Sequence, residues 1–356
     1  MMLNKIVAAF FPGEKVAEVA PYGNGHINDT YKVEFEGEAA PCILQKINIA
    51  VFTNPGGLVD NHIKIQKFME SGEWELEIPS LYPVTSGGYL HIDKEGGVWR
   101  MMNFIPESYS IGIVKEEWQA SQAGNGYGWF ASSCASLDAS GFVEAIKDFH
   151  RLSFRVWQLD EAIKGDRAGR LADVKELVGF YKARQEKLMV IERMVDAGEI
   201  PMRVVHNDTK IDNLLFRGEK ACAVIDLDTV GPGILYYDFG DSIRTISNTA
   251  AEDEKDLDKV EFNAIAFREF ARGYLSKVKS ITTPGEAGYY YLAPVLMTFI
   301  MGIRFLADYL NGDVYYKTHY PDHNLVRSRV QRRLIEGMEK QENYMKEVIA
   351  GILQNE

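Results

Sequence analysis

The sequence predicts an α+β protein with a small β-rich N-terminal lobe and a larger, mainly helical C-terminal lobe. Short alternating segments broken by turn residues dominate the first third of the chain, and long helix-like segments dominate the rest. The chain has 356 residues, which suits about two domains, and 46% of them are hydrophobic, so it can bury sizeable cores. Pro106 ends the last strand-like segment, and we therefore assign residues 1–105 to the first lobe and 106–356 to the second.

The strand signals of the first lobe form a simple series. Residues 31–35 alternate polar and apolar side chains with period two, and residues 41–47 are their expected partner across a turn that contains glycine. A helix-like stretch follows at 59–69, and two more short strands are expected at 88–92 and 98–104. This order predicts a small sheet with one inserted helix.

The second lobe contains six helix-like segments and one stretch of strand character between them. Three glycines oppose the first helix, since each costs ~1 kcal/mol inside a helix. We retain it because Gly124 and Gly128 lie one turn apart and would allow close packing against another helix. The six segments are 115–136, 142–154, 171–195, 253–278, 287–310 and 324–354.

Composition and charge exclude several classes of protein. The chain carries 39 basic and 51 acidic side chains, a formal net charge of −12, which argues against a general nucleic-acid binder and against anionic membrane surfaces. Its three cysteines are odd in number and widely spaced, as expected in a reducing compartment. The apolar run at 6–11 is too short for a signal sequence, and segment 289–305 contains Pro294 and Arg304, so we expect a buried helix there. A cytoplasmic protein is predicted.

A run of polar residues between two apolar flanks marks the candidate site. Residues 206–213 have the spacing H-x-D-x-x-x-x-N, in which Asp208 and Asn213 are the aspartate and the asparagine. Two short apolar strands within 214–225 then form a hairpin. Folding this hairpin brings Asn213 nearly opposite Asp226, which follows the second strand. The converging amide and carboxylate oxygens are ligands that Mg²⁺ prefers.

This spacing, followed by a strand that ends in an acid, is the pattern of a kinase catalytic loop and its metal-binding aspartate. In that pattern Asp208 accepts or orients the proton of the substrate hydroxyl, and Asn213 and Asp226 hold the metal. Lys210 is placed to neutralise the γ-phosphate, although a solvated surface lysine would show the same spacing. Asp228 follows Asp226 by two residues, so a continuing strand would point both to the same face, as a second metal contact or an acceptor for substrate hydroxyls.

A second aspartate competes for the metal-binding role. Asp238 begins a D-F-G string, which in protein kinases carries a metal ligand. No strand pairing brings it back to Asn213, whereas the hairpin does so for Asp226. We therefore assign the metal to Asp226 and expect Asp238 to be structural, holding the catalytic loop through hydrogen bonds.

The first lobe offers candidate contacts for a nucleotide. Gly23 and Gly25 precede the first clear strand, where glycines let backbone N–H groups approach phosphates, although an ordinary hairpin turn would look the same. A kinase of this layout carries a lysine on its third strand and often a glutamate on the next helix. The strand here offers Gln45 and Lys46, which face opposite sides, so only one can reach the phosphates. The helix has no glutamate before Glu70.

The segment between the lobes is the expected adenine contact. Residues 101–105 form the natural connection from the first lobe to the second, and backbone groups there, with Asn103 and Ile105 as candidates, could bond to adenine. The expected cofactors are therefore ATP and Mg²⁺.

With these motifs the chain resembles the aminoglycoside phosphotransferase and choline kinase-like superfamily, small-molecule kinases with a protein-kinase-like fold. Within it, the chain is most similar to the bacterial N-acetylhexosamine 1-kinases. The resemblance implies that Asp208 is the base and that Asn213 and Asp226 hold Mg²⁺. It also implies sugar contacts from His26, Asp228, Arg304 and Tyr315. The strings that carry it are YGNGHIN (22–28), HNDTKIDN (206–213), IDLDTVGPG (225–233), YDFGDSIR (237–244), RFLADYLNGDVYY (304–316) and HYPDHNLVR (319–327).

Three of these sugar contacts have plain structural alternatives. Arg304 could pair with Asp308 in the same helix, His26 could be an ordinary loop residue, and Tyr315 could belong to the core. The acceptor could instead be choline, homoserine or an aminoglycoside; the acidic composition suits a cationic acceptor, whereas Arg304 does not. A non-catalytic nucleotide-binding protein is the further alternative, because the lysine–glutamate pair is missing. The base and both metal ligands argue against it.

Overall fold

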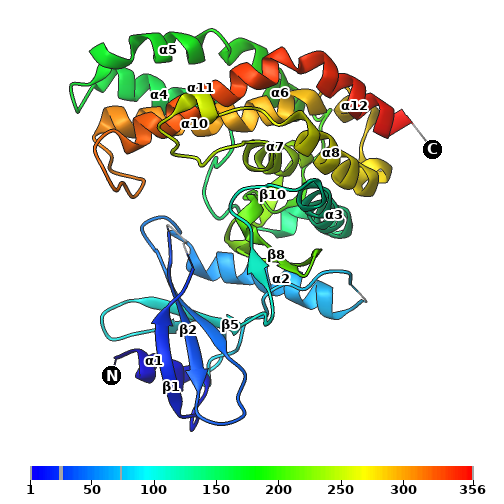
Figure 1. The fold of residues 1–356 in the computed structure, drawn as a ribbon. Coiled ribbons are helices and arrows are strands. Elements are labelled where there is room, and N and C mark those ends of the chain that lie inside the picture. Colours follow the sequence, from blue (N-terminus) through cyan, green and yellow to red (C-terminus); the bar gives the residue numbers. More distant parts are fainter. Residues whose placement is uncertain (1, 24–26, 73, 355–356) are drawn as a thin grey trace.

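The computed structural model describes residues 2–23, 27–72 and 74–354, which fold into a smaller lobe and a larger one (Figure 1). The smaller lobe contains β1 (Val16–Pro21), β2 (Asp29–Phe35), β3 (Cys42–Ile47), β4 (His91–Ile92) and β5 (Val98–Asn103). These strands form one antiparallel sheet in the order β1-β2-β3-β5-β4. The chain leaves this sheet after Asn103, and from Tyr109 it pairs with a hairpin of the larger lobe.

The two faces of this sheet are covered by different helices. Helix α1 (Met2–Phe10) packs its apolar residues against one face, in a cluster that contains Trp99. Helix α2 (Pro55–Glu70) covers the opposite face, where Val59 packs near Met102. Successive side chains along a strand point to opposite faces of the sheet, so neighbouring residues reach opposite sides of the lobe.

One side chain of α2 fastens the smaller lobe to the larger one. Asn54 caps the helix by accepting a hydrogen bond of 3.0 Å from the N–H of Gly57. Further along, the buried Asn61 donates from Nδ2 to the carbonyls of Val143 (2.7 Å) and Val230 (2.9 Å). Its Oδ1 also accepts from the N–H of Val143 at 3.0 Å. Helix α2 is therefore tied to two separate segments of the larger lobe.

The larger lobe is mainly helical, and its short strands lie on the side that meets the smaller lobe (Figure 1). Its helices are α3 (Glu117–Cys134), α4 (Leu152–Gly165), α5 (Lys175–Lys182), α6 (Gln185–Asp196), α7 (Leu235–Ile246), α8 (Ala264–Val278), α9 (Pro284–Ala287), α10 (Ala293–Asn311), α11 (His323–Lys340) and α12 (Glu342–Gln354). Its strands are β6 (Tyr109–Ser110), β7 (Arg203–Val205), β8 (Leu214–Arg217), β9 (Lys220–Val224) and β10 (Gly231–Gly233). Strands β6, β8 and β9 form one small sheet, and β7 pairs with β10.

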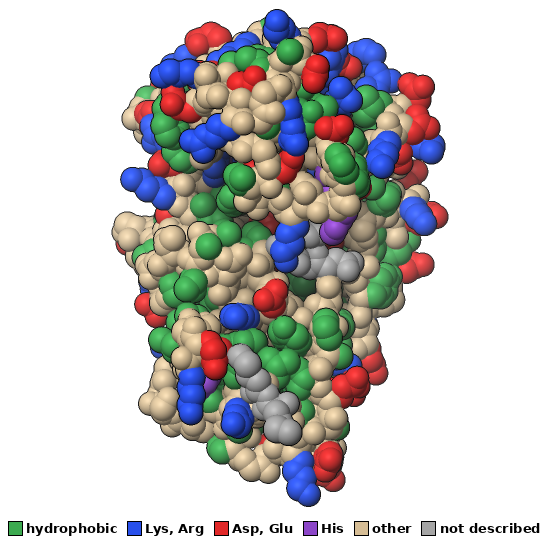
Figure 2. All heavy atoms as spheres, turned by 90° about the vertical axis from the view of Figure 1, so that its left-hand side faces the viewer, with side chains coloured by type: hydrophobic (Ala, Val, Ile, Leu, Met, Phe, Trp, Pro, Cys, Tyr) green, Lys and Arg blue, Asp and Glu red, His purple; other side chains and the backbone are tan. Residues whose placement is uncertain are grey.

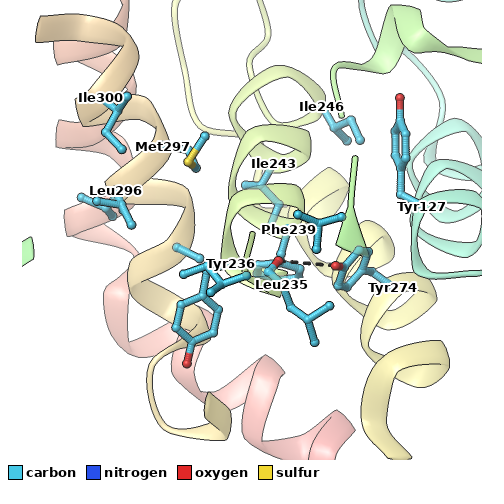
Figure 3. Close-up of a cluster of buried hydrophobic side chains, with 14 of the residues drawn as sticks. Tyr127, Leu235, Tyr236, Phe239, Ile243, Ile246, Tyr274, Leu296, Met297 and Ile300 are labelled. Carbon is cyan, nitrogen blue, oxygen red and sulfur yellow. Dashed lines mark hydrogen bonds between the residues drawn. The ribbon is translucent and has the colours of Figure 1, made fainter. Parts of the chain in front are cut away.

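Helix α7 lies at the centre of this lobe. Its Phe239 and Ile243 are fully buried, and Tyr274 of α8 donates its hydroxyl to the carbonyl of Leu235 at 3.4 Å (Figure 3). The polar residues of the helix, among them Asp238 and Ser242, are buried as well. A helix that is buried on all sides has no solvent-facing stripe, so its polar side chains can form hydrogen bonds with the backbone of neighbouring loops.

Helices α3 and α8 approach each other closely through glycine. A Cβ atom on Gly124 would overlap the carbonyl oxygen of Phe270, and one on Gly128 would lie 2.8 Å from the Cα of Tyr274. From the other side, a Cβ atom on Gly273 would lie 2.7 Å from the backbone oxygen of Ser121. The helix expected at 115–136 and the close packing expected of its glycines are both confirmed.

The structure confirms the fold class and corrects several helix boundaries. Residues 142–151 are irregular rather than helical, because their backbone serves other segments: Val143 binds Asn61 of α2. The expected helix 171–195 is broken between α5 and α6, and the expected helix 253–278 begins only at Ala264. Helix α7 was not expected at all.

The most apolar helix is a core helix. Among the described residues, Tyr290–Asn311 is the one helix long and apolar enough to cross a membrane, and 83% of its most apolar window is buried inside the protein. It packs against α4, α7 and α11. The buried helix expected at 289–305 is confirmed.

Candidate active site

The backbone of the catalytic loop is held by Asp238, in the first turn of α7. The N–H groups of His206 and Asn207 donate to its two carboxylate oxygens at 2.9 and 2.8 Å. Its carbonyl accepts from the hydroxyl of Thr209 at 2.6 Å. Asp238 is completely buried and both its oxygens are used by the loop, so the structure places it where a structural role was expected.

Side chains of the loop then bind the segment that follows the hairpin. Asn207 adopts a left-handed conformation (φ 64°), which asparagine tolerates, and its Nδ2 donates to the carbonyl of Thr229 at 3.0 Å. The hydroxyl of Thr229 donates back to the carbonyl of His206 at 2.8 Å. The Nδ1 of His206 accepts from the N–H of Asp208, so its Nε2 donates to the carbonyl of Ile225 at 2.9 Å. Burial lowers the pKa of His206, which is consistent with a neutral, structural ring.

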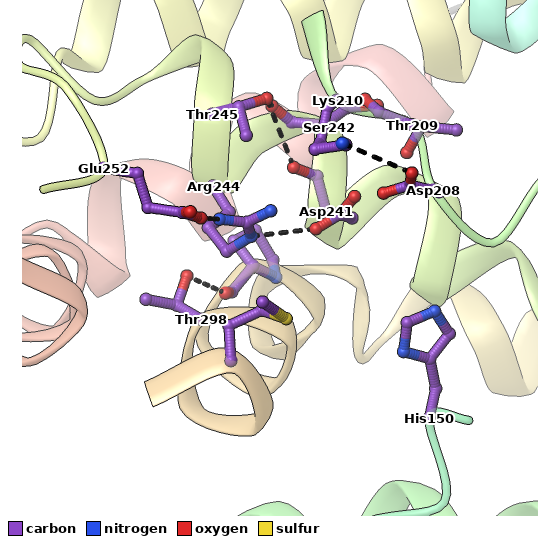
Figure 4. Close-up of polar contacts among 12 residues, drawn as sticks. His150, Asp208, Thr209, Lys210, Asp241, Ser242, Arg244, Thr245, Glu252 and Thr298 are labelled. Atoms are coloured by element: carbon purple, nitrogen blue, oxygen red, sulfur yellow. Dashed lines mark hydrogen bonds and ion pairs between the residues drawn. The ribbon is translucent and has the colours of Figure 1, made fainter. Parts of the chain in front are cut away.

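The loop presents Asp208, Lys210 and Asn213 together. The Nδ2 of Asn213 donates to the carbonyl of Asp208 at 2.9 Å and to its Oδ2 at 3.1 Å. The ammonium group of Lys210 lies 3.4 Å from the same Oδ2 (Figure 4). The charge of Asp208 raises the pKa of Lys210 well above its usual value. The carboxylate of Asp208 is partly exposed, at 26%, and can therefore still receive a substrate hydroxyl.

The hairpin brings Asp226 to the same place. Strands β8 and β9 pair with Leu214 opposite Val224, and the N–H of Ile225 donates to the carbonyl of Asn213 at 2.9 Å. Asp226 follows in a left-handed conformation (φ 59°) and is exposed to solvent. Desolvation by the surrounding protein, and then repulsion from Asp228 and Asp208, raise its pKa to about 7.

Such repulsion is what a bound cation would relieve, so the donor set fits Mg²⁺. The described residues contain no group of three or more His, Cys, Asp or Glu side chains arranged to hold a metal alone. Mg²⁺ usually keeps several waters and shares its remaining ligands with substrate phosphates. Asn213 and Asp226 are the two protein ligands that such a site would need.

Asp228 does not lie on a continuing strand, because residues Leu227–Thr229 form a 3-10 turn. Its side chain is nevertheless directed at the smaller lobe and is only 3% exposed. Its Oδ2 accepts from the Nδ2 of Asn28 at 2.6 Å, and its Oδ1 forms an ion pair with Arg100. The carboxylate therefore joins the lobes in this structure, and its role as a sugar contact stays a prediction.

In the smaller lobe the two candidate side chains of β3 face opposite sides. Lys46 lies on the face covered by α1, with its ammonium 5.7 Å from the centre of the Trp99 ring. Gln45 faces the larger lobe, and its Oε1 accepts two hydrogen bonds from Arg100. The structure thus places Gln45, and not Lys46, on the side of the sheet that meets the larger lobe. Gly23 has a left-handed conformation (φ 77°) in the turn after β1, whereas Gly25 and His26 lie outside the described residues.

The connection between the lobes has an apolar lining. The Oδ1 of Asn103 accepts from the N–H of Ser80 at 2.6 Å, so this side chain is used within the protein. Ile105 is buried and packs with Leu215 and Ile225 of the hairpin. This cluster is an apolar surface at the hinge, as an adenine ring requires.

On the far side of the catalytic loop, Arg304 of α10 lies among aromatic rings. Its guanidinium is 5.0 Å from the ring centre of Phe149, 5.5 Å from that of Tyr316 and 5.9 Å from that of Tyr315. Asp308 is not its partner, because that carboxylate accepts from the N–H groups of residues 314–316 at 2.9–3.0 Å. No described carboxylate pairs with Arg304, and Tyr315 is 49% exposed rather than part of the core.

His150 connects this aromatic group to the catalytic loop, and no motif in the sequence marks it. Its Nε2 donates to the carbonyl of Asn207 at 2.7 Å, while burial lowers its pKa to about 3. Figure 4 shows it on the same side of the view as Asp208, with a gap between the two side chains. A cavity of about 200 Å³ opens next to it, lined by Phe149, Asn207 and Tyr237 among others, but not by Asp208 or the metal ligands. The surface view shows histidine and basic side chains at the level where the lobes meet (Figure 2).

The comparison with protein families decides the class of this site. A model of the phosphotransferase enzyme family matches residues 18–273, which include the glycine turn, the catalytic loop and Asp226. The chain belongs to this phosphotransferase family. The matched residues end before Arg304 and Tyr315, so the acceptor side of this phosphotransferase is not covered by the match.

Solved structures similar to this phosphotransferase share its fold. A microcompartment-associated aminopropanol kinase is 13% identical with a TM-score of 0.63, over 97% of this chain and 98% of that one. Choline kinase from Cryptosporidium parvum Iowa II is 13% identical with a TM-score of 0.62, over 99% of both chains. The aminoglycoside phosphotransferase APH(2'')-Ib, bound to ADP, is 14% identical with a TM-score of 0.53, over 95% and 97%. These likenesses confirm the protein-kinase-like fold.

Proposed function

We propose that this phosphotransferase transfers the γ-phosphoryl group of ATP to the anomeric hydroxyl of an N-acetylhexosamine, giving the 1-phosphate. The acceptor would be N-acetylglucosamine or N-acetylgalactosamine, as the sequence resemblance implies. The observation that carries this choice is Arg304, a guanidinium among aromatic rings without a carboxylate partner in the described chain. Such a group can donate to a carbonyl or ring oxygen of a neutral sugar, and aromatic rings suit the apolar faces of a sugar.

The catalytic loop supplies the chemistry of the transfer. The acceptor oxygen forms the new bond to the γ-phosphorus while the bond from that phosphorus to the leaving ADP oxygen breaks, and the hydroxyl proton passes to Asp208. Lys210 lies beside Asp208 and would place its positive charge near the transferred group. Asn213 and Asp226 would hold Mg²⁺, which when bound neutralises charge on the phosphate oxygens. For the nucleotide, the apolar cluster at Ile105 and the turn at Gly23 support binding of adenine and phosphates.

A cationic acceptor is the main alternative. The cavity beside His150 is rimmed by four acidic residues, Glu144, Asp148, Glu192 and Asp196. Arg151 already pairs with two of them, Glu192 and Asp196. Choline or an aminoglycoside would also bring a positive charge close to Arg304, and the repulsion between the two charges disfavours such an acceptor. A neutral sugar therefore fits the charges better.

The position of phosphorylation gives the decisive test. We expect free N-acetylglucosamine or N-acetylgalactosamine to release ADP and to give a sugar 1-phosphate by phosphorus NMR, because one hydroxyl is held in line with Asp208. The methyl glycosides, blocked at C1, should not react. Phosphorylation of a methyl glycoside at a comparable rate would instead indicate a 6-kinase or an unselective kinase. If choline or homoserine were consumed and neither sugar were, the sugar assignment would be lost and the phosphotransferase would remain.

The acceptor contact can be tested at Arg304 itself. We expect Arg304→Ala to raise the KM for the sugar by about tenfold or more and to leave the KM for ATP unchanged, because a desolvated hydrogen bond from a cation is lost. Arg184→Ala is the matched control: this arginine also stacks on an aromatic ring, at 3.6 Å from the centre of Phe180, but it already has a carboxylate partner in Glu339. An unchanged sugar KM in Arg304→Ala would remove Arg304 from the acceptor site.

A further inference from the structure

The strand position that carries a lysine in protein kinases carries Gln45 here, and a cation stands beside it on the next strand. Strands β3 and β5 pair with Gln45 opposite Arg100, so both side chains point to the same face of the sheet. That face is turned toward α2 and the larger lobe. Helix α2 presents the buried His62 there, while its Glu70 is exposed and bonded to Gln66. The described residues therefore contain no lysine–glutamate pair in this place.

Arg100 is held in a fixed position between the lobes. Its Nε and Nη2 donate to the Oε1 of Gln45 at 2.9 and 2.6 Å. Its Nη2 also forms the ion pair with Asp228, and Asn28 supports the same carboxylate. Only 2% of the Arg100 side chain and 3% of the Asp228 side chain are exposed, so water screens this pair very little.

The cluster is not fully satisfied, which points to a missing partner. The Nη1 of Arg100 and the Nδ1 of His62 are buried without a hydrogen-bond partner among the described residues. A buried guanidinium donor without an acceptor is unfavourable, and functional sites are where such groups persist.

We propose that Arg100 is a positioning residue of the nucleotide site: it supplies the positive charge of the smaller lobe, and through Asp228 it orients the metal-binding loop that carries Asp226. Asp228 thus replaces the helix glutamate as the partner of this cation. Because the pair joins the two lobes directly, the affinity for the metal–nucleotide complex and the relative position of the lobes depend on the same contact. This inference rests on the phosphotransferase activity but not on the identity of the acceptor.

The test measures binding of ADP with Mg²⁺ by calorimetry, without any acceptor. We expect Arg100→Met to bind ADP about tenfold more weakly or worse and to need more Mg²⁺ for half-saturation, whereas Arg100→Lys, which keeps the charge, should recover part of the loss. Arg203→Met is the matched control. It breaks another buried pair, Arg203–Glu286, within the larger lobe, so it should lower the melting temperature without changing either binding constant.

A second variant covers the case in which Arg100→Met does not fold. The double substitution Arg100→Met, Asp228→Leu leaves no unpaired buried charge, and such replacements are often well tolerated. It should fold and still bind ADP with Mg²⁺ weakly. Binding within about twofold of the unmodified protein, in either the single or the double variant, would overturn the proposal. Since no acceptor is present, failure of the sugar assignment would not affect this result.

Discussion

Asp208→Asn should fold and bind nucleotide normally but turn over about 10²–10⁴-fold more slowly, because a positioned base contributes that much to proton transfer. The backbone of the loop is held by Asp238 and does not depend on the Asp208 side chain. An asparagine can keep the contact from Asn213 through its oxygen while losing the ability to take a proton. The measurement is kcat with saturating ATP and acceptor, together with the Kd of the nucleotide.

Asp212→Asn is the control for this substitution. Asp212 lies four residues further along the catalytic loop, in the 3-10 turn Ile211–Asn213, but it is exposed to solvent, so we expect its substitution to change kcat by no more than about twofold. A kcat for Asp208→Asn within about threefold of the unmodified protein would exclude Asp208 as the base.

Asp226→Asn should abolish measurable activity and weaken Mg²⁺ binding by about 100-fold or more, since one of two protein ligands loses its charge. Asparagine is the appropriate replacement because it tolerates the left-handed backbone of this position, where alanine would be strained.

The same substitution should not lower the free energy of unfolding, although it abolishes activity. The pKa of Asp226 is raised to about 7 in the folded protein, so its ionised form opposes folding above that pH and the opposition disappears as the pH falls. At about pH 8 the variant should melt at the same temperature or higher.

Asp238→Ala is the contrasting variant for the metal assignment. It leaves two buried N–H groups of the catalytic loop without acceptors, at a cost of about 2–4 kcal/mol in the free energy of unfolding. The loss of activity in this variant should follow its loss of folded protein. If the folded fraction lost Mg²⁺ binding while Asp226→Asn kept it, the assignment of the metal to Asp226 would be reversed.

The parts of the site that are close in sequence were the parts that spacing could predict. Asn213 and Asp226 flank one hairpin, so a single pair of apolar strands was enough to place them together. The structural role of Asp238 could be predicted in the same way, because no hairpin connects Asp238 to Asn213. Close packing of α3 was visible in the spacing of Gly124 and Gly128.

The parts that were missed depend on contacts between distant segments or on polar residues inside the core. Arg100 meets Asp228 across the two lobes, and only its place among the apolar residues 98–102 could have drawn attention to it. Helix α7 carries an apolar stripe, but Asp238 and Ser242 interrupt its sequence with polar residues that turn inward to hold the catalytic loop. The segment before α4 looked helical, yet its His150 and Val143 form hydrogen bonds with other segments, with Asn207 and Asn61 respectively.

The attachment of α2 has a consequence for how this protein can be controlled. Regulated protein kinases switch on and off by swinging the corresponding helix toward or away from the nucleotide. Here that movement would break all three hydrogen bonds of Asn61, two of them to Val143 and one to Val230, just beyond the metal-binding loop. The position of α2 is therefore fixed by its hydrogen bonds to the larger lobe. We therefore expect nucleotide binding to depend on the side chains of the site and not on a displacement of α2.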